Sequence, residues 1–325
     1  MRNSSFDTAR FFACFFIVAV HVGYYNDYSQ QFGEIFRALS RWALPFFFLI
    51  SGYFIGVKSV DNYSKRINKL IWIFIVASVI FIPYAILKKM ENGPVSFVKI
   101  AASLFSVDSL VYGNYFHLWF LPSLITGMLL TRLVIDNFKI STGLTVSLLM
   151  ILLTWAADVL AFFRHGEEFF YYFRFLLSFP LVYIGWYVAK IKPLFSLSLA
   201  LALLIFGFAM IATEMSLLRY FTEYNGMERQ FPLFSAFVAI VLLMCCANVT
   251  LRRNLLSDLG EKYSLGIYLF HPLFLPIAKM ALNKIQFYNS CIHLVSTFLL
   301  TILFVVALDK LAPRFNNYIN GSSIQ

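Results

Sequence analysis

The stretch Phe6–Tyr25, FDTARFFACFFIVAVHVGYY, decides the fold class because it is apolar and long enough to cross a bilayer as a helix. Three ionisable side chains, Asp7, Arg10 and His21, interrupt it. In a helix, Arg10 and His21 would lie roughly 20° apart around the axis and about 16 Å apart along it. Asp7 precedes Arg10 by one turn, a spacing at which side chains meet. Ionisable groups at membrane depth are energetically costly, so this face predicts a functional site.

The composition of the whole chain is typical of a polytopic membrane protein. Hydrophobic residues make up 60% of the 325 residues, and charged residues make up 13%. A soluble domain has about 25% charged residues. The formal charge of +10 is spread over short loops, which favours cytoplasmic contact with anionic lipid over a nucleic-acid partner. The four cysteines lie in apolar segments, without the spacing of a disulfide framework or a metal site.

Ten apolar segments of spanning length follow one another, mostly joined by short polar loops. We therefore predict an all-α fold, a single integral-membrane domain over residues 1–325. The predicted spans are 8–25, 35–57, 69–88, 114–134, 142–162, 170–189, 194–213, 231–250, 263–282 and 289–311. The distribution of Lys and Arg favours both termini in the cytoplasm. Glu167, Glu214 and Glu223 would then lie on the opposite side.

Prolines predict irregular backbone within two of these spans. In span 35–57, Pro45 indicates a kinked or broken helix, although an ordinary kinked packing helix is an equal alternative. In span nine, Tyr268 and His271 lie on one helix face, and Pro272 is expected to interrupt the helix directly after them. Broken backbone at membrane depth is tolerated where it is buried or lines a cavity.

Further basic and aromatic residues open three other spans. Taken alone, they are explained by positive-inside anchoring and by the aromatic belt at a membrane surface. These residues are Lys65, Arg66, Lys69, His117, Trp119 and Arg174.

Taken in order, the motifs resemble the membrane acyltransferase-3 family of multi-spanning O-acyltransferases. The similarity rests on Arg10-x10-His21 preceded by Asp7, the segment FFFLISGY at 46–53, the basic entry to the third span, HLWFL at 117–121 and YSLGIYLFHP at 263–272. The ordered set covers nearly the whole chain. The family often shows Arg-x-x-Arg where this chain has Arg66 and Lys69, and lysine keeps the charge but loses the bidentate fork.

The resemblance implies a multi-pass enzyme of the bacterial inner membrane that transfers an acyl group, with acetyl-coenzyme A as the expected co-substrate. A hydroxyl of a surface or lipid-linked glycan would be the acceptor. The implied catalytic residues are His21, Arg10 and Asp7. The implied donor-binding residues are Arg10, Lys65, Arg66 and Lys69, whose charges suit phosphates. The implied acceptor-binding residues are His117, Trp119, Arg174, Tyr268 and His271. No metal or permanently bound cofactor is expected, and a homo-oligomer stays open.

Several alternatives stay open at this point. His21 would act as a general base, the simpler route, or would carry the acyl group itself. A transporter or flippase of a lipid-linked glycan would use the same polar stripe without consuming acyl-CoA. A structural or sensing membrane protein would use the polar groups between helices and would tolerate conservative changes at His21. The acceptor and the length of the acyl chain are not determined.

Overall fold

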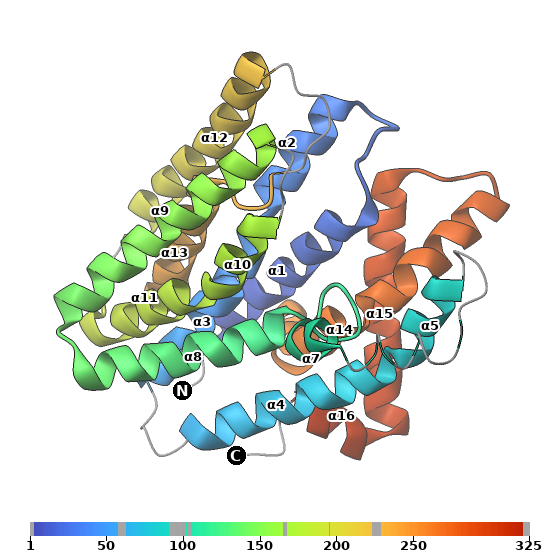
Figure 1. Ribbon diagram of the computed structural model, residues 1–325, viewed down its shortest axis with the longest axis horizontal. Coiled ribbons are helices and arrows are strands. Elements are labelled where there is room, and N and C mark those ends of the chain that lie inside the picture. The colour runs from blue at the N-terminus through green and yellow to red at the C-terminus, as the bar shows by residue number, and fades with distance from the viewer. Residues whose placement is uncertain are drawn as a thin grey trace.

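The computed structural model describes residues 3–57, 63–90, 106–164, 168–194, 196–222 and 229–320, with the single positions 96, 100, 102 and 104. Regular structure in these ranges is entirely helical (Figure 1). The helices are α1 (Ser4–Val22), α2 (Gln30–Ser40), α3 (Ala43–Val57), α4 (Tyr63–Ile80), α5 (Ile82–Met90), α7 (Val107–Tyr112), α8 (Phe120–Asn137), α9 (Ile140–Arg164), α10 (Glu168–Leu176), α11 (Ser178–Ile191), α12 (Leu197–Thr222), α13 (Leu233–Asn248), α14 (Leu255–Lys284), α15 (Ser290–Leu311) and α16 (Pro313–Asn320).

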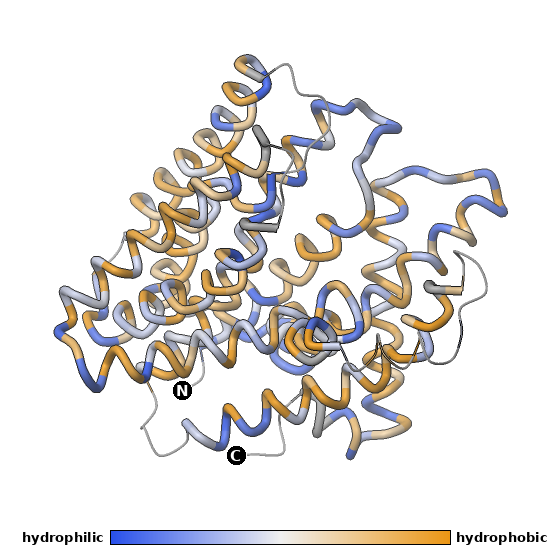
Figure 2. Tube along the Cα trace, viewed as in Figure 1, coloured by the Kyte–Doolittle hydropathy of each residue, from blue (hydrophilic) through white to orange (hydrophobic). Residues whose placement is uncertain are grey.

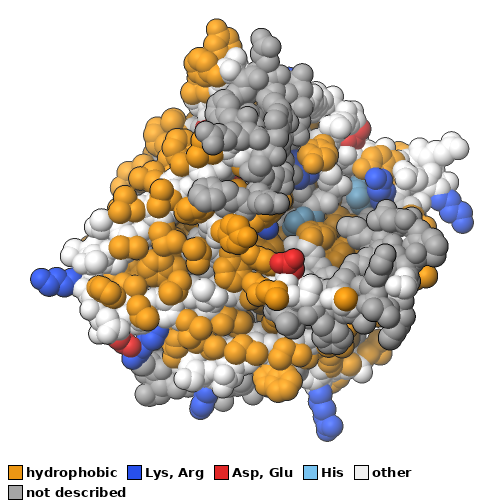
Figure 3. Space-filling model, in the orientation of Figure 1, with side chains coloured by type: hydrophobic (Ala, Val, Ile, Leu, Met, Phe, Trp, Pro, Cys, Tyr) orange, Lys and Arg blue, Asp and Glu red, His pale blue; other side chains and the backbone are white. Residues whose placement is uncertain are grey.

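Within the described ranges, seven segments are long and apolar enough to cross a membrane. They are Ser4–Val22, Gln30–Val57, Ile140–Ala161, Phe170–Ile191, Leu197–Phe221, Leu255–Lys284 and Ser290–Leu311. Apolar residues run along most of their length and cover much of the visible surface (Figures 2 and 3). Helix α13 is apolar but shorter. The predicted spans 69–88 and 114–134 coincide with α4, α5 and α8, which are not among these seven segments, so the count of ten is not confirmed.

Helices α1 and α14 form the centre of the site and run parallel to each other. Near the start of both, a Cβ on Gly260 would lie 1.9 Å from the backbone oxygen of Asp7, so only glycine permits this close approach. Near the end of α1, the rings of His21 and His271 lie 5.3 Å apart. Residue numbers therefore rise together along both helices, and His21 of the α1 stripe meets His271 of the α14 stripe.

The backbone break predicted in the second span exists, but it falls before the proline. Helix α2 ends at Ser40, and α3 begins at Ala43. Pro45 therefore lies in the first turn of α3, where its missing N–H leaves no helical bond unmade. Two residues, 41 and 42, separate the two helices.

The interruption predicted at Pro272 is wrong, because α14 continues through Pro272 and Pro276. Proline at position 272 cannot donate to the carbonyl four residues earlier, which belongs to Tyr268. The ring nitrogen Nδ1 of His271 lies 2.8 Å from that same oxygen. A carbonyl oxygen only accepts, so Nδ1 carries the proton and replaces the lost backbone bond. His271 thereby pairs the carbonyl oxygen that Pro272 leaves without a helical hydrogen bond.

The acidic residues assigned to the outer side do not all lie in loops. Glu214 lies within α12 and accepts hydrogen bonds from the guanidinium of Arg229 and the indole of Trp155. The helix extends beyond the predicted boundary at 213, which carries this carboxylate into the bundle. Glu167 and Glu223 lie outside the described residues.

Candidate functional site

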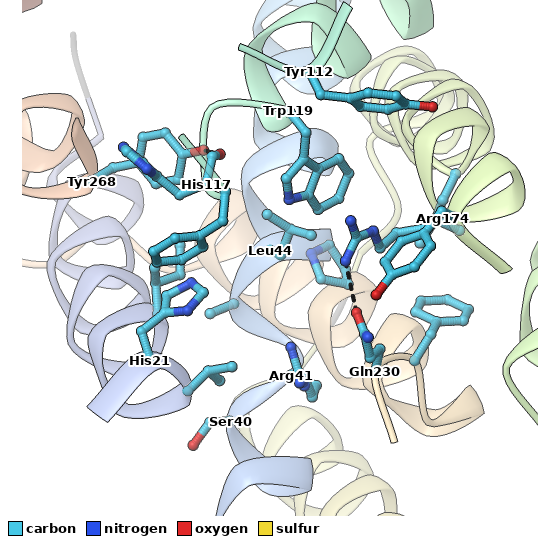
Figure 4. Close-up of a pocket in the computed structure, with 18 of the residues that line it drawn as sticks. His21, Ser40, Arg41, Leu44, Tyr112, His117, Trp119, Arg174, Gln230 and Tyr268 are labelled. Atoms are coloured by element: carbon cyan, nitrogen blue, oxygen red, sulfur yellow. Dashed lines mark hydrogen bonds between the residues drawn. The ribbon is translucent and has the colours of Figure 1, made fainter. Parts of the chain in front are cut away.

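A cavity of about 550 Å³ lies beside the end of α1. Five of the predicted site residues line it, although they come from four separate parts of the chain (Figure 4). They are His21, His117, Trp119, Arg174 and Tyr268. Figure 4 shows His21, His117 and Tyr268 on one side of the cavity, and Arg174 and Gln230 on the other. The structure thus brings the motifs of the first, fourth, sixth and ninth predicted spans to one place.

Three imidazoles, two of which line the cavity, pack together at the end of α1. His21, in the last turn of α1, stacks on His271 at 5.3 Å between ring centres and 27° between ring planes. His117 lies 5.8 Å from His271 in an edge-on arrangement. The polar stripe of α14 therefore contributes two residues to the site: Tyr268 lines the cavity, and His271 packs against His21 without lining it.

Contacts with backbone carbonyls determine which ring nitrogens of His117 and His271 can accept a hydrogen bond. His117 Nε2 lies 3.1 Å from the oxygen of Leu269, so Nε2 carries the proton and donates it. His117 Nδ1 and His271 Nε2 are then hydrogen-bond acceptors. Both atoms are buried, and neither has a hydrogen-bond partner in the described part of the chain. Two acceptor nitrogens are thus available within the immediate surroundings of His21.

The opposite wall is cationic. Arg174 donates to Gln230 Oε1 at 2.7 Å, and its guanidinium carbon lies 4.3 Å from the Trp119 ring centre and 4.5 Å from the Tyr171 ring centre. Contacts with two aromatic faces and a neutral amide orient the guanidinium. Arg41 also lines the cavity, and Figure 4 places it between the wall of His21 and Gln230.

Among the cavity residues that sequence reasoning missed are Arg37, Arg41 and Gln230. Arg37 donates to the backbone oxygen of Gly23 and contacts the ring of Tyr24. Arg37 and Arg41 are four residues apart and therefore share a helix face just before a strongly apolar run. That spacing was a usable signal. Gln230 had none, since its position depends on a contact with a distant helix.

A buried ion network fixes the segment that carries Gln230. The guanidinium of Arg229 donates to Asp158 at 2.6 Å and to Glu214 at 3.0 Å, and its side chain is only 1% exposed. Asp158 also accepts from the backbone N–H groups of Gln230 and Phe231. The network joins α9, α12 and the start of α13, and it holds Gln230 in contact with Arg174. Asp158 lies inside a predicted span, which by itself indicated an important role.

The remaining predicted residues lie apart from the cavity. Asp7 and Arg10 form an ion pair at 2.8 Å near the start of α1, and the guanidinium of Arg10 lies 5.1 Å from the ring centre of Phe54. The basic cluster Lys65, Arg66 and Lys69 lies on the first two turns of α4. None of these predicted donor-site residues is among those that line the cavity.

Comparison with known families gives a match over nearly the whole chain. The acyltransferase-3 family model, described as an acyltransferase domain, matches residues 3–310. No solved structure matches significantly.

Among curated proteins, the chain is similar to parts of two kinds of racemase. It is 34% identical over 151 residues to a serine/alanine racemase of Enterococcus gallinarum, which covers 43% of this chain and 21% of that protein. It is 27% identical over 161 residues to an amino-acid racemase of Enterococcus faecalis, which covers 46% of this chain and 22% of that protein. The chain therefore spans about a fifth of the length of these relatives.

Proposed function

Because the chain belongs to the acyltransferase-3 family, we propose that it transfers an acyl group, most simply acetyl, from acyl-coenzyme A to a hydroxyl of a surface or lipid-linked glycan. The observation that carries this proposal is the cavity in which His21 meets His117, Trp119 and Arg174. The racemases match this chain through only about a fifth of their length, so racemisation is not part of the proposal.

In the proposed reaction, His21 acts as the general base. The acceptor oxygen attacks the thioester carbonyl while a nitrogen of His21 takes the hydroxyl proton, and the coenzyme A thiolate leaves and takes up a proton. His271 supports this role because its ring stacks on His21 and leaves room for the substrate on the cavity side. The alternative is a two-step route in which His21 is acylated first and then passes the group on.

We place the donor phosphates at the basic residues near the starts of α1 and α4. Arg10, Lys65, Arg66 and Lys69 would bind them from the cytoplasmic side of a bacterial inner membrane, and Asp7 would orient Arg10 through their ion pair. Helix α1 connects this end to the cavity. His21 lies eleven helical steps after Arg10, about 16 Å along the helix, a distance that the long pantetheine arm suits.

Substitution of His21 tests the proposal. We expect His21→Gln and His21→Ala to lower acyl-CoA turnover by at least ~10²-fold, because glutamine forms hydrogen bonds but cannot accept a proton at neutral pH. The measurement is acetyl-CoA consumption and acetylation of isolated surface glycans by protein in lipid nanodiscs. His293→Gln is the control, since His293 is a buried histidine that contacts the backbone oxygen of Leu275, away from the cavity.

Retention of more than about a tenth of the turnover by His21→Gln would exclude base catalysis by this residue. Movement of a lipid-linked glycan across the nanodisc or vesicle membrane without any acyl-CoA consumption would instead support the transporter. An acylated His21, trapped by rapid quenching and found by mass spectrometry, would support the two-step route over direct base catalysis.

A further inference from the structure

One ring nitrogen of His271 is a buried acceptor without a donor. The other nitrogen, Nδ1, carries the ring proton, because it lies 2.8 Å from the backbone oxygen of Tyr268, to which Pro272 cannot donate. Nε2 is therefore the hydrogen-bond acceptor of the ring. The side chain is 0% exposed, and Nε2 has no partner in the described part of the chain. A buried acceptor that lacks a donor is energetically costly, so a donor close to Nε2 is required.

Three rings of the described chain contact the ring of His271, and two of them have no donor left. The Nε2–H of His117 donates to the backbone oxygen of Leu269, and the hydroxyl of Tyr268 donates to the backbone oxygen of His117. A neutral imidazole has a single N–H, so His117 has no second one to offer. The third ring is His21, which no hydrogen bond joins to another residue in the ranges that the structure describes. His21 is left as the donor.

The separation of the two rings suits a hydrogen bond between them. The ring centres of His21 and His271 lie 5.3 Å apart, with 27° between the ring planes. An imidazole nitrogen lies about 1.2 Å from its ring centre, so two nitrogens turned toward each other at this separation would be about 2.9 Å apart, a usual hydrogen-bond distance. These two described rings are not hydrogen-bonded in the structure, and a rotation of the His21 ring forms the bond.

This hydrogen bond would decide which nitrogen of His21 serves as the base. His271 Nε2 only accepts, so the nitrogen of His21 that faces it must carry the ring proton. The other nitrogen then directs its lone pair away from His271 and toward the cavity, which His21 lines and His271 does not. When His21 takes the proton of the acceptor hydroxyl, the N–H toward His271 keeps its partner. That contact strengthens as the imidazolium forms, because hydrogen bonds of an ionised group are roughly twice as strong as neutral ones.

We propose that His271 is a positioning residue, which accepts a hydrogen bond from His21 and thereby fixes the tautomer and the direction of the base. It takes the part that a carboxylate plays in a Ser-His-Asp triad, although His271 is neutral and takes up no proton itself. Pro272 contributes because the carbonyl oxygen that it leaves unpaired holds His271 in the accepting tautomer. This inference rests on the proposed acyl transfer and adds a residue to it.

Nitrogen NMR of the wild-type protein tests the hydrogen bond itself. The full chain with isotope-labelled histidine is measured in nanodiscs by solid-state NMR, and the signals are assigned by their loss in His21→Gln and His271→Gln. We expect one tautomer of His21, with its N–H proton correlated to the unprotonated nitrogen of His271. A protonated Nε2 on His271, a correlation of that nitrogen with water alone, or an equal mixture of His21 tautomers would overturn the inference.

Turnover of acetyl-CoA with isolated surface glycans tests the consequence for catalysis. His271→Leu removes the acceptor, and we expect kcat to fall about 10- to 100-fold while KM changes little. The amide of His271→Gln both donates and accepts, so this variant should retain more of kcat, and it serves if His271→Leu does not fold. His293→Leu is the matched control and should keep the wild-type kcat. His293 is also buried, with one nitrogen on the backbone oxygen of Leu275 and the other unpartnered in the described part of the chain.

The two measurements separate this inference from the proposed function. The expected NMR correlation in a protein that transfers no acyl group would support the hydrogen bond and count against the proposed function alone. A wild-type kcat in His271→Leu, or a loss confined to KM, overturns the positioning role, and the loss of turnover in His21→Gln would still support the base. Equal losses in His271→Leu and His293→Leu indicate a packing role and likewise overturn the inference.

Discussion

At the scale of single residues, the site depends on which backbone group each imidazole contacts. His271 donates to the backbone oxygen of Tyr268, to which Pro272 cannot donate because it has no N–H. His117 donates to the backbone oxygen of Leu269. These contacts fix the tautomer of each ring and leave one acceptor nitrogen on each. The hydrogen bond of His271 to Tyr268 stabilises the helix that carries it, whereas the hydrogen bond of His117 to Leu269 orients a ring that lines the cavity.

Donor binding is also decided by single side chains. We expect Arg66→Ala to weaken coenzyme A binding more than Lys190→Ala, because Arg66 belongs to the basic cluster at the start of α4 and Lys190 lies at the end of α11, outside that cluster. A charge-assisted contact to phosphate contributes about 1.5–3 kcal/mol, or roughly 10- to 100-fold in affinity. Isothermal calorimetry with coenzyme A measures both variants. Equal losses would assign Arg66 to membrane anchoring, and Lys69→Arg should bind as the wild-type protein does.

At the scale of elements, the site is built between helices that meet through unusual contacts. Helices α1 and α14 approach closely at Gly260, which aligns their polar stripes. The segment before α13 is tied to α9 and α12 by the ion network of Asp158, Glu214 and Arg229. The first contact determines where His21 lies, and the second determines where Gln230 holds Arg174.

Removal of the buried guanidinium tests the second of these contacts. We expect Arg229→Met to lower the free energy of unfolding by about 3–5 kcal/mol, because it leaves two carboxylates buried without their cation. Arg253→Met is the control: its pair with Asp258 is exposed, and loss of an exposed pair costs about 1 kcal/mol or less. Thermal unfolding in nanodiscs compares the two variants. Similar losses would mean that the network does not hold the segment 229–233 in place.

At the scale of the whole molecule, the first and last helices lie toward one side of the bundle, and the loops after α1 and after α14 lie toward the other. The start of α1 and helix α16 lie toward the same edge of the bundle in Figure 1. The loop after α1 is tied to the start of α15 through Asp27, which accepts from the backbone N–H of Ser290 at 2.7 Å. The loops after α1 and after α14 therefore belong to one side of the bundle, opposite the ends.

Impermeant cysteine labelling determines how this arrangement lies in the membrane. In a background without the four native cysteines, we expect Gln286→Cys to react in intact cells and Arg314→Cys to react only after the membrane is opened. The expectation follows from the positive-inside rule and both termini in the cytoplasm. Gln286 and Arg314 are both exposed, so burial does not explain a difference between them. Reaction of Arg314→Cys in intact cells would reverse the proposed orientation.

The predictions from sequence were strongest where the signal was local. The apolar segments and their polar stripes on α1 and α14 follow from residue spacing along one helix, and the helices form there. The family followed from the order of short motifs, and the match over residues 3–310 confirms it. The prediction of an interruption at Pro272 was wrong because it considered the proline alone. The side chain of His271 replaces the backbone hydrogen bond that Pro272 cannot make.

Residue spacing along the chain is enough to predict an apolar, helical membrane protein with His21 on a polar face, because helical periodicity and hydropathy depend only on residues a few positions apart. Only the folded molecule shows that Arg37, Arg41 and Arg174 share a cavity with His21, and that Gln230 contacts Arg174. Those contacts join residues from distant parts of the chain, through close helix approach at Gly260 and the buried charges of Asp158, Glu214 and Arg229. Such contacts depend on how helices pack against each other, which local spacing does not specify.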